Sequence, residues 1–155
     1  MKITQFPKKE NHSPQCFVLD ASGQLLGRLA TRVSKLLMGK ELSFFTPGID
    51  QGNFVVIYNA ENVIITGKKE EQKLYYRNSQ RPGSLKTESF SHLKKRIPSR
   101  IVERAVWGML PKGVLGRNYY RRLYVYSGKN VSKIGTLGSV PLSTVKHVSF
   151  HYISL

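Results

Sequence analysis

The chain has 155 residues, the length of a single domain, and its 40% hydrophobic content is ordinary for a globular protein. Its 25 Lys and Arg residues against 9 Asp and Glu give a formal net charge of +16, which makes a polyanion such as nucleic acid the first partner to expect. The single cysteine, Cys16, excludes a disulfide scaffold, and the longest apolar run, residues 54–58, is too short to span a membrane. The polar start of the chain lacks the apolar segment of a secretory signal.

The first half of the chain is predicted to begin with an irregular arm. Residues 1–15 contain prolines and mostly polar side chains, which is typical of such an arm. The apolar residues 16–19 predict a buried strand. From Leu25 apolar residues recur at three- and four-residue spacing as far as Gly39, which predicts an amphipathic helix that this glycine caps. A second buried strand is predicted at residues 54–58.

The middle of the chain is predicted to contain two more strands and a helix. Residues 63–66 and 73–77 are rich in β-branched and aromatic side chains, which favour strands. A short helix through Phe90 and Leu93 must close before Pro98, because the residue that precedes a proline avoids the helical conformation.

Two further helices and a last strand are predicted after this proline. Ser99 is expected to cap the N-terminus of the first of these helices, and residues 111–113 are expected to end it. The apolar stripe of this helix consists of Ile101, Val102, Ala105, Val106 and Met109. The short helix that follows is predicted to turn two residues inward, Leu115 and Tyr119, and three outward, Arg117, Arg121 and Arg122. The last clear strand is predicted at residues 123–126.

This order of strands and helices favours an α/β sandwich over an all-β barrel. Residues 129–155 are rich in Ser and Val and alternate in polarity only around Val148, Phe150 and Tyr152. This tail is therefore expected to be either an added strand or a partner-binding extension. We predict one domain at residues 16–128, between the N-terminal arm and this C-terminal extension.

The positive charge is concentrated in the second half of the chain. Residues 78–155 contain 14 basic and 2 acidic side chains, whereas residues 1–77 contain 11 and 7. Residues 94–122 alone contain nine basic residues and one acid. Because a solvated face usually mixes charges of both signs, this run favours phosphate contacts over a merely soluble surface. A membrane surface is a weaker alternative, since no stretch joins this charge to a wide apolar helical face.

The alternative function from another class is a nucleotide-dependent enzyme that uses the turn from Gly23 to Gly27. This turn lies between a strand and a helix, but it fits neither the dinucleotide-binding pattern nor the P-loop pattern of glycines. The four histidines lack the partners and spacing of a zinc site, and Cys16 lies in an apolar strand as a packed thiol. We therefore predict no catalytic residue, cofactor, metal or small-molecule substrate.

Several motifs carry a family resemblance. DASGQLLGRLA occupies residues 20–30, FTP residues 45–47, RPG residues 81–83 and, most specifically, GMLPKGVLGR residues 108–117. In order over residues 16–128, these motifs resemble the bacterial-type large-subunit ribosomal protein L13 family (uL13). The resemblance implies a three-layer α/β/α sandwich around a small mixed β-sheet. It also implies a non-enzymatic protein that binds and helps to fold large-subunit (23S-type) rRNA during assembly, beside neighbouring ribosomal proteins.

The chain departs from the family pattern at several positions. Gly48, Asn53 and Asn78 stand where the family usually has His, Asp and His, and residues 131–133 replace a His-Pro-His motif. Such drift is typical of an organellar ribosome. RPG and residues 96–103 look like plastid and cyanobacterial members, which favours a plastid (chloroplast) ribosome over the mitochondrial matrix or a bacterial cytoplasm. The absence of a transit peptide then implies a chain that is organelle-encoded or already processed.

The candidate rRNA-binding residues are basic side chains in the matched motifs and in the basic second half. The first group is Lys112, Arg117, Arg121 and Arg122; the second is Arg81, Lys86, Arg100 and Arg104; the third is Arg28 and Lys68. Gly113 and Gly116 are expected to allow a tight turn and the close approach of a bulky partner. The tyrosine pairs at residues 75–76 and 119–120 offer rings that can stack on unpaired bases, although at least one ring of each pair is expected to point into the core.

Overall fold

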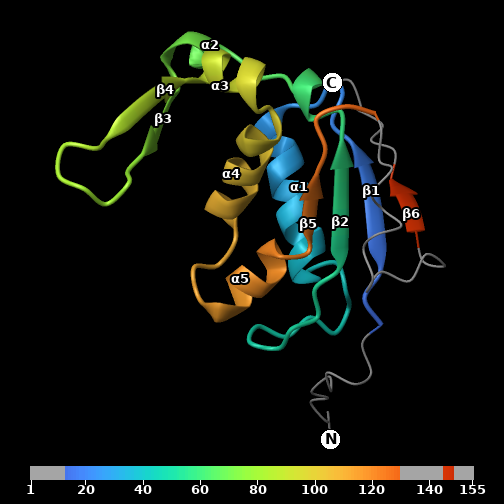
Figure 1. Cartoon of the computed structure of the whole chain (residues 1–155). Helices are drawn as coiled ribbons and strands as arrows, with labels where there is room; N and C mark the ends of the chain where they lie inside the picture. The colour runs from blue at the N-terminus through green and yellow to red at the C-terminus, as the bar shows by residue number, and fades with distance from the viewer. Residues whose placement is uncertain (1–12, 130–144, 149–155) are drawn as a thin grey trace, which may run out of the picture.

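A parallel four-stranded sheet organises the part of the chain that the computed structural model describes, residues 13–129 and 145–148. In spatial order the strands are β5 (Leu123–Val125), β2 (Phe54–Tyr58), β1 (Cys16–Asp20) and β6 (Val145–Val148) (Figure 1). All three pairings in this sheet are parallel. The first three of these strands confirm the sequence predictions to within one residue at each end.

The predicted amphipathic helix is α1 (Leu26–Met38). Its buried face includes Leu29, Val33 and Leu37, each at most 1% exposed. Gly39 ends the helix with a φ of 74°, and its N–H donates to the Leu36 carbonyl. A side chain at this position would also collide with the backbone of Gln51, so glycine satisfies both the left-handed conformation and the close contact.

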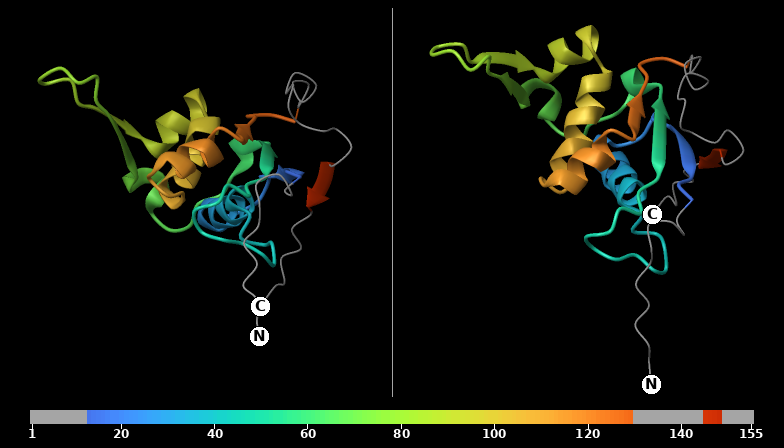
Figure 2. Two further views of the ribbon diagram at one scale, coloured as in Figure 1. Left: turned by 90° about the horizontal axis from the view of Figure 1, so that it is seen from below. Right: turned by 60° about the horizontal axis from the view of Figure 1, so that its bottom comes forward.

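The two faces of the sheet are covered differently. Leu19, Val55 and Ile57 belong to the main core, to which α1 and the later helices contribute. Val18 and Val56 alternate with them and belong to a separate cluster on the other face, together with Cys16. In both views of Figure 2, α1 and the later helices lie on one side of the sheet. The α/β class is thus confirmed, but only one helical layer lies within the described residues, and the sheet is parallel there instead of mixed.

The segment between β2 and β5 supplies the remaining elements. In chain order they are η2 (Ala60–Asn62), α2 (Lys69–Gln72), β3 (Leu74–Arg77), β4 (Lys86–Ser89), α3 (Phe90–Arg96), α4 (Ser99–Met109) and α5 (Val114–Tyr120). β3 and β4 form an antiparallel hairpin that projects from the body of the molecule (Figure 1). The helices of the described part of the chain are too short and too polar to traverse a bilayer.

Three local predictions are wrong. Residues 63–66 form no strand, because Ile64 makes only an isolated bridge with Leu25 beside the start of α1. Ser99 is the first residue of α4 and makes no capping hydrogen bond, because Pro98 already has helical backbone angles and takes the N-cap position. Met109, assigned to the apolar stripe, is 42% exposed. The other members of the stripe are buried or half-buried.

The C-terminal tail contributes to the sheet at one point. Val145–Val148 pairs with β1 as an edge strand, which agrees with the added-strand alternative for this short segment. Phe150 and Tyr152 lie outside the described residues, as do most of the predicted arm at residues 1–15 and the segment at residues 130–144.

Three residues that depart from the family pattern suit their local backbone. Gly48 has a φ of 100°, which favours glycine over any side chain. The buried Asn53 donates to the Leu36 carbonyl and accepts from the Gln15 N–H. A carboxylate in this place has no proton to donate to Leu36. Asn78 accepts from the Gln80 N–H and the Ser84 hydroxyl at the tip of the hairpin.

Candidate nucleic-acid interface

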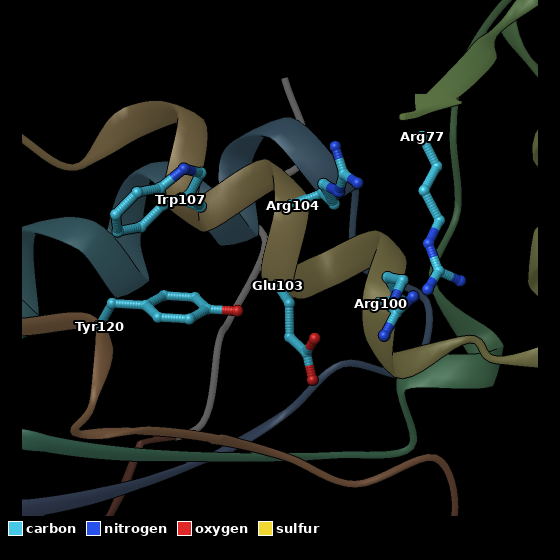
Figure 3. A pocket seen from close by; sticks show the side chains of 6 residues that line it. All are labelled: Arg77, Arg100, Glu103, Arg104, Trp107 and Tyr120. Atoms are coloured by element: carbon cyan, nitrogen blue, oxygen red, sulfur yellow. The ribbon is translucent and has the colours of Figure 1, made fainter. Parts of the chain in front are cut away.

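The outer face of α4, the hairpin and the end of α5 line a basic cavity that is open to solvent. Its volume is about 480 Å³, and it is lined by Arg77, Arg100, Glu103, Arg104, Trp107 and Tyr120 (Figure 3). Arg77 ends β3, Tyr120 ends α5, and the other four residues lie on α4. Three elements that are separate in the sequence therefore meet at one site.

The helical repeat explains why α4 contributes four of these residues. Positions 100, 103, 104 and 107 fall on one face, because side chains three and four residues apart are neighbours on a helix. Ile101, Val102 and Val106 lie on the opposite face and are at most 3% exposed. Packing of the apolar face against the core therefore turns the basic and aromatic face outward.

Two aromatic rings form one wall of the cavity. The ring centroids of Trp107 and Tyr120 are 5.1 Å apart with an interplanar angle of 66°, an edge-to-face contact. Tyr119 is buried at 4% exposure, so the adjacent Tyr120 ring is the one left half-exposed. In the other pair Tyr76 is 54% exposed, and the Tyr75 hydroxyl oxygen is buried without a hydrogen-bond partner among the described residues. In both pairs one ring therefore points inward, as predicted.

The charge in this cavity is largely uncompensated. Within residues 13–129 and 145–148, the guanidinium groups of Arg77, Arg100 and Arg104 form no ion pair with an acidic side chain. Glu103 is the one acid in the lining. Burial raises the pKa of the Tyr120 hydroxyl, the Glu103 carboxylate raises it further, and the nearby arginines oppose this shift. A cluster of unpaired cations around a cavity favours an anionic ligand.

A second, smaller cavity continues this basic surface between the hairpin and α4. Its volume is about 100 Å³, and Lys86, Arg96 and Arg100 are among its lining residues. Glu88 accepts two hydrogen bonds from Arg96, at 3.0 and 2.6 Å, and one from His92 at 2.7 Å. These bonds lower the pKa of Glu88 to about 2. Arg96 is therefore neutralised at the base of the hairpin, whereas the arginines of the larger cavity are not.

The tip of the hairpin presents Arg81. The Ser84 N–H donates to the Arg81 carbonyl across a turn in which Gly83 has a φ of 72°. The Arg81 side chain is exposed. Residues 81–84 therefore form a turn that exposes an arginine, at the end of the hairpin away from the sheet (Figure 1).

Arg122 lies in an ion pair with Asp50 instead of pointing freely outward. Its guanidinium donates to both carboxylate oxygens of Asp50, at 2.7 and 2.6 Å, and the side chain is only 23% exposed. A side chain at Gly52 would collide with this guanidinium and with the Leu37 carbonyl. The expectation that Arg122 points outward is therefore wrong, because the residue clamps the loop before β2 to the end of α5.

The loop from α4 to α5 also differs from expectation in part. Lys112 donates to the Trp107 carbonyl at 2.7 Å, with its nitrogen 5.1 Å from the Trp107 ring centroid, so it caps the C-terminus of α4 while it stays exposed. The space at Gly116 is filled by the Pro111 backbone of the same loop and not by an external partner. Arg117 and Arg121 are exposed, as predicted.

The structure brings together only part of the predicted set. Lys86, Arg100 and Arg104 line the two cavities, whereas Arg28 on α1 and Lys68 before α2 are exposed elsewhere. Tyr120 belongs to a pair that the sequence offers for base stacking, whereas Arg77, Glu103 and Trp107 were not among the predicted residues. The spacing of positions 100, 103, 104 and 107 was the available signal for the face of α4. No local signal placed Arg77 or Tyr120 beside it.

The alternative nucleotide-binding site, at the Gly23–Gly27 turn, has few backbone N–H groups left to bind a phosphate. The Gly23 N–H donates to Asn62, the Gln24 N–H to Ala21 and the Leu26 N–H to Ile64, each to a backbone carbonyl. The donors that a phosphate-binding loop turns towards its ligand are therefore used within the fold. Burial raises the pKa of the Cys16 thiol, which disfavours the reactive thiolate. The described residues also contain no group of His, Cys, Asp or Glu that could hold a metal ion.

Comparison with known proteins gives a consistent result. The family described as Ribosomal protein L13 matches residues 14–132. The chain is 52% identical over 130 residues to the large ribosomal subunit protein uL13 of Gloeothece citriformis, with 84% of this chain and 86% of the relative covered. The uL13 proteins of a Picosynechococcus strain and a Cyanothece strain are 52% and 50% identical, over 81% and 83% of this chain and 83% and 86% of the relatives. The chain therefore belongs to the Ribosomal protein L13 family, and it is a structural ribosomal protein and not an enzyme.

Proposed function

We propose that this chain is a constituent of the large ribosomal subunit that binds and helps to fold 23S-type rRNA during assembly. The observation that carries the proposal is the set of unpaired arginines, Arg77, Arg100 and Arg104, which the hairpin and α4 hold around one cavity. Placing like charges together costs free energy unless an anion compensates them, and RNA phosphates provide that compensation. Neighbouring ribosomal proteins are the other expected partners.

The binding surface extends from this cavity in two directions. Lys86 and Arg81 continue it along the hairpin, and Arg117 and Arg121 continue it at the end of α5. A basic surface spread over several elements suits RNA, whose folded strands present phosphates in several directions. Arg28 and Lys68 are secondary contacts in this proposal, and Arg122 contributes through the fold.

The salt dependence of binding tests this function. We expect the affinity of the full chain for a large-subunit rRNA fragment to fall with salt concentration, with a log–log slope of magnitude about 5 or more. Filter binding between low and moderate salt measures this slope. An affinity independent of salt would show that phosphate neutralisation is not the mechanism.

We propose a plastid ribosome as the compartment, with a bacterial ribosome as the alternative. The support is the 50–52% identity to cyanobacterial relatives together with the drift at Gly48, Asn53 and Asn78. Co-sedimentation of the chain with plastid or with bacterial large subunits decides between them. We further propose residues 16–128 as the rRNA-binding domain, flanked by the arm at 1–15 and the extension at 129–155.

A further inference from the structure

We propose that the cavity between α4, α5 and the hairpin binds one unstacked RNA nucleotide, with its base against Trp107 and Tyr120 and its phosphates at the arginines. This inference rests on the proposed rRNA binding and names the ligand of one subsite within it. The volume of about 480 Å³ lies within the roughly 300–1,000 Å³ of ligand pockets. The site therefore has room for a flat ring and its backbone, and not only for a phosphate.

The distribution of chemistry along the cavity matches the two ends of a nucleotide. In Figure 3 the rings of Trp107 and Tyr120 lie at one end and the guanidinium groups of Arg77 and Arg100 at the other, with Glu103 between them. A nucleotide likewise has a flat base with stacking faces at one end and a charged phosphate at the other. A surface that only neutralises phosphates needs no half-exposed aromatic wall, whereas an unpaired base stacks on one.

Glu103 indicates how the base is read. Its carboxylate only accepts hydrogen bonds, and it repels a phosphate, so its presence among three arginines calls for a ligand that also carries N–H donors. Guanine presents two adjacent donors, N1–H and the N2 amino group, which match the two oxygens of a carboxylate. Uracil presents a single N–H between two carbonyl oxygens and fits least well. The site is therefore expected to prefer guanine.

The single tryptophan of the chain makes the site directly observable. Trp107 is the one tryptophan among the 155 residues, so tryptophan fluorescence arises from this wall of the cavity. Lys112 lies near the same ring, and the abasic hairpin therefore serves as the control for phosphate contacts at that lysine. The probes are RNA hairpins with one stem sequence and a single bulged position, which holds guanosine, uridine or an abasic ribose. The full chain is titrated with each hairpin at low salt, and free guanosine monophosphate serves as a fourth probe.

The four probes have distinct expected results. We expect the guanosine bulge to quench Trp107 and to bind roughly 5- to 100-fold more tightly than the abasic bulge, which is the range of one base–aromatic stack. Uridine should fall between them, and the free nucleotide should not quench at concentrations that saturate with RNA. Equal binding of the guanosine and abasic hairpins would overturn the base site while leaving phosphate-driven RNA binding intact. Saturation by the free nucleotide at the same concentrations would also overturn it, in favour of a mononucleotide site.

If none of the RNA hairpins bound to the chain, that result would instead contradict the proposed function itself.

Three variants test the roles of Trp107 and Glu103, with thermal melting as the folding control and the binding of labelled RNA as the measurement. Trp107→Ala should remove the advantage of guanosine over the abasic bulge, and Trp107→Phe, which keeps an aromatic face, should retain most of it. Glu103→Gln preserves size and should reduce the preference for guanosine over uridine. An unchanged preference in Glu103→Gln would show that this carboxylate does not read the base.

Discussion

Arg122 and Arg100 illustrate two different uses of the same side chain. Arg122 gives both ends of its guanidinium to Asp50 and is 23% exposed, next to the core. Arg100 lines the cavity beside α4 and forms no ion pair with an acid in the described part of the chain. A paired, partly buried arginine stabilises the fold, whereas an unpaired one at a cavity remains available for an anion. Position in the basic half of the sequence does not distinguish the two.

The largest effect is expected on the buried face of α4, opposite the basic cavity. Val106 is fully buried, so Val106→Asp should unfold the domain, at a cost of about 4 kcal/mol or more for an unpaired buried charge. Met109→Asp places the same charge on the same helix at a position that is 42% exposed and should cost much less, about 0.3–1 kcal/mol, because an acid at the C-terminus of α4 opposes the helix dipole. Urea denaturation of both variants measures the difference, and equal stabilities would mean that the buried face of α4 is misassigned.

The comparison of the two arginines can be tested directly. Arg122→Ala leaves Asp50 without its partner and should lower the free energy of unfolding by about 1–3 kcal/mol. Arg100→Ala should change it by less than about 0.5 kcal/mol. For rRNA affinity we expect the opposite order, with Arg100→Ala weakening binding more than Arg122→Ala. Arg100→Ala removes one phosphate contact and should reduce the magnitude of the salt slope by about 1.

These two variants are measured by urea denaturation and by filter binding. Arg122→Lys is a matched control, since it keeps the charge but loses the two-pronged contact with Asp50. If Arg122→Ala proved as stable as the parent and bound rRNA less well, Arg122 would belong with the binding residues after all.

A smaller effect separates Lys112 from Arg117. Lys112→Glu removes the hydrogen bond to the Trp107 carbonyl and puts a negative charge at the C-terminus of α4, which should cost about 0.3–1 kcal/mol. Arg117→Glu, at an exposed position in the last turn of α5, loses no such hydrogen bond and should cost less, at most about 0.5 kcal/mol from the helix dipole. Both should weaken rRNA binding and incorporation into large subunits, and the double variant more than either. Normal assembly of the double variant would exclude this loop as a contact.

The smallest expected effect is on the stability of the fold at low pH. The pKa of Glu88 is about 2 in the fold, held down mainly by Arg96 and then by His92, against an ordinary value of 4.5. Because the folded pKa is the lower one, the stabilisation is complete above pH 4.5 and is lost as the pH falls from there towards 2. Glu88→Gln should therefore flatten part of the acid limb of the stability curve. Identical acid limbs for parent and variant, followed by circular dichroism, would show that this pair does not anchor the hairpin.

Local sequence patterns determined the elements that bury an apolar face. The strands at 16–19 and 54–58 are continuous apolar runs, and the helix that ends at Gly39 repeats its apolar residues with helical spacing. In these segments the hydrophobic pattern in the sequence agrees with the surface that the fold buries, so the pattern alone is enough to predict the element. The resemblance carried by residues 20–30 and 108–117 identified the family, which the comparisons confirm.

Tertiary structure decided which charged residues pair and which remain free. Asp50 lies 72 residues before Arg122, and Arg77 lies well before Tyr120, so no local pattern brings either pair to one place. The same holds for residues 63–66, whose β-branched composition favours a strand but which form a single isolated bridge, between Ile64 and Leu25, within the described residues. Strand formation and charge pairing both depend on a neighbour from a distant part of the chain. The sequence thus determined where apolar surface would be buried, and the fold alone determined which arginines pair with an acid and which line a cavity without one.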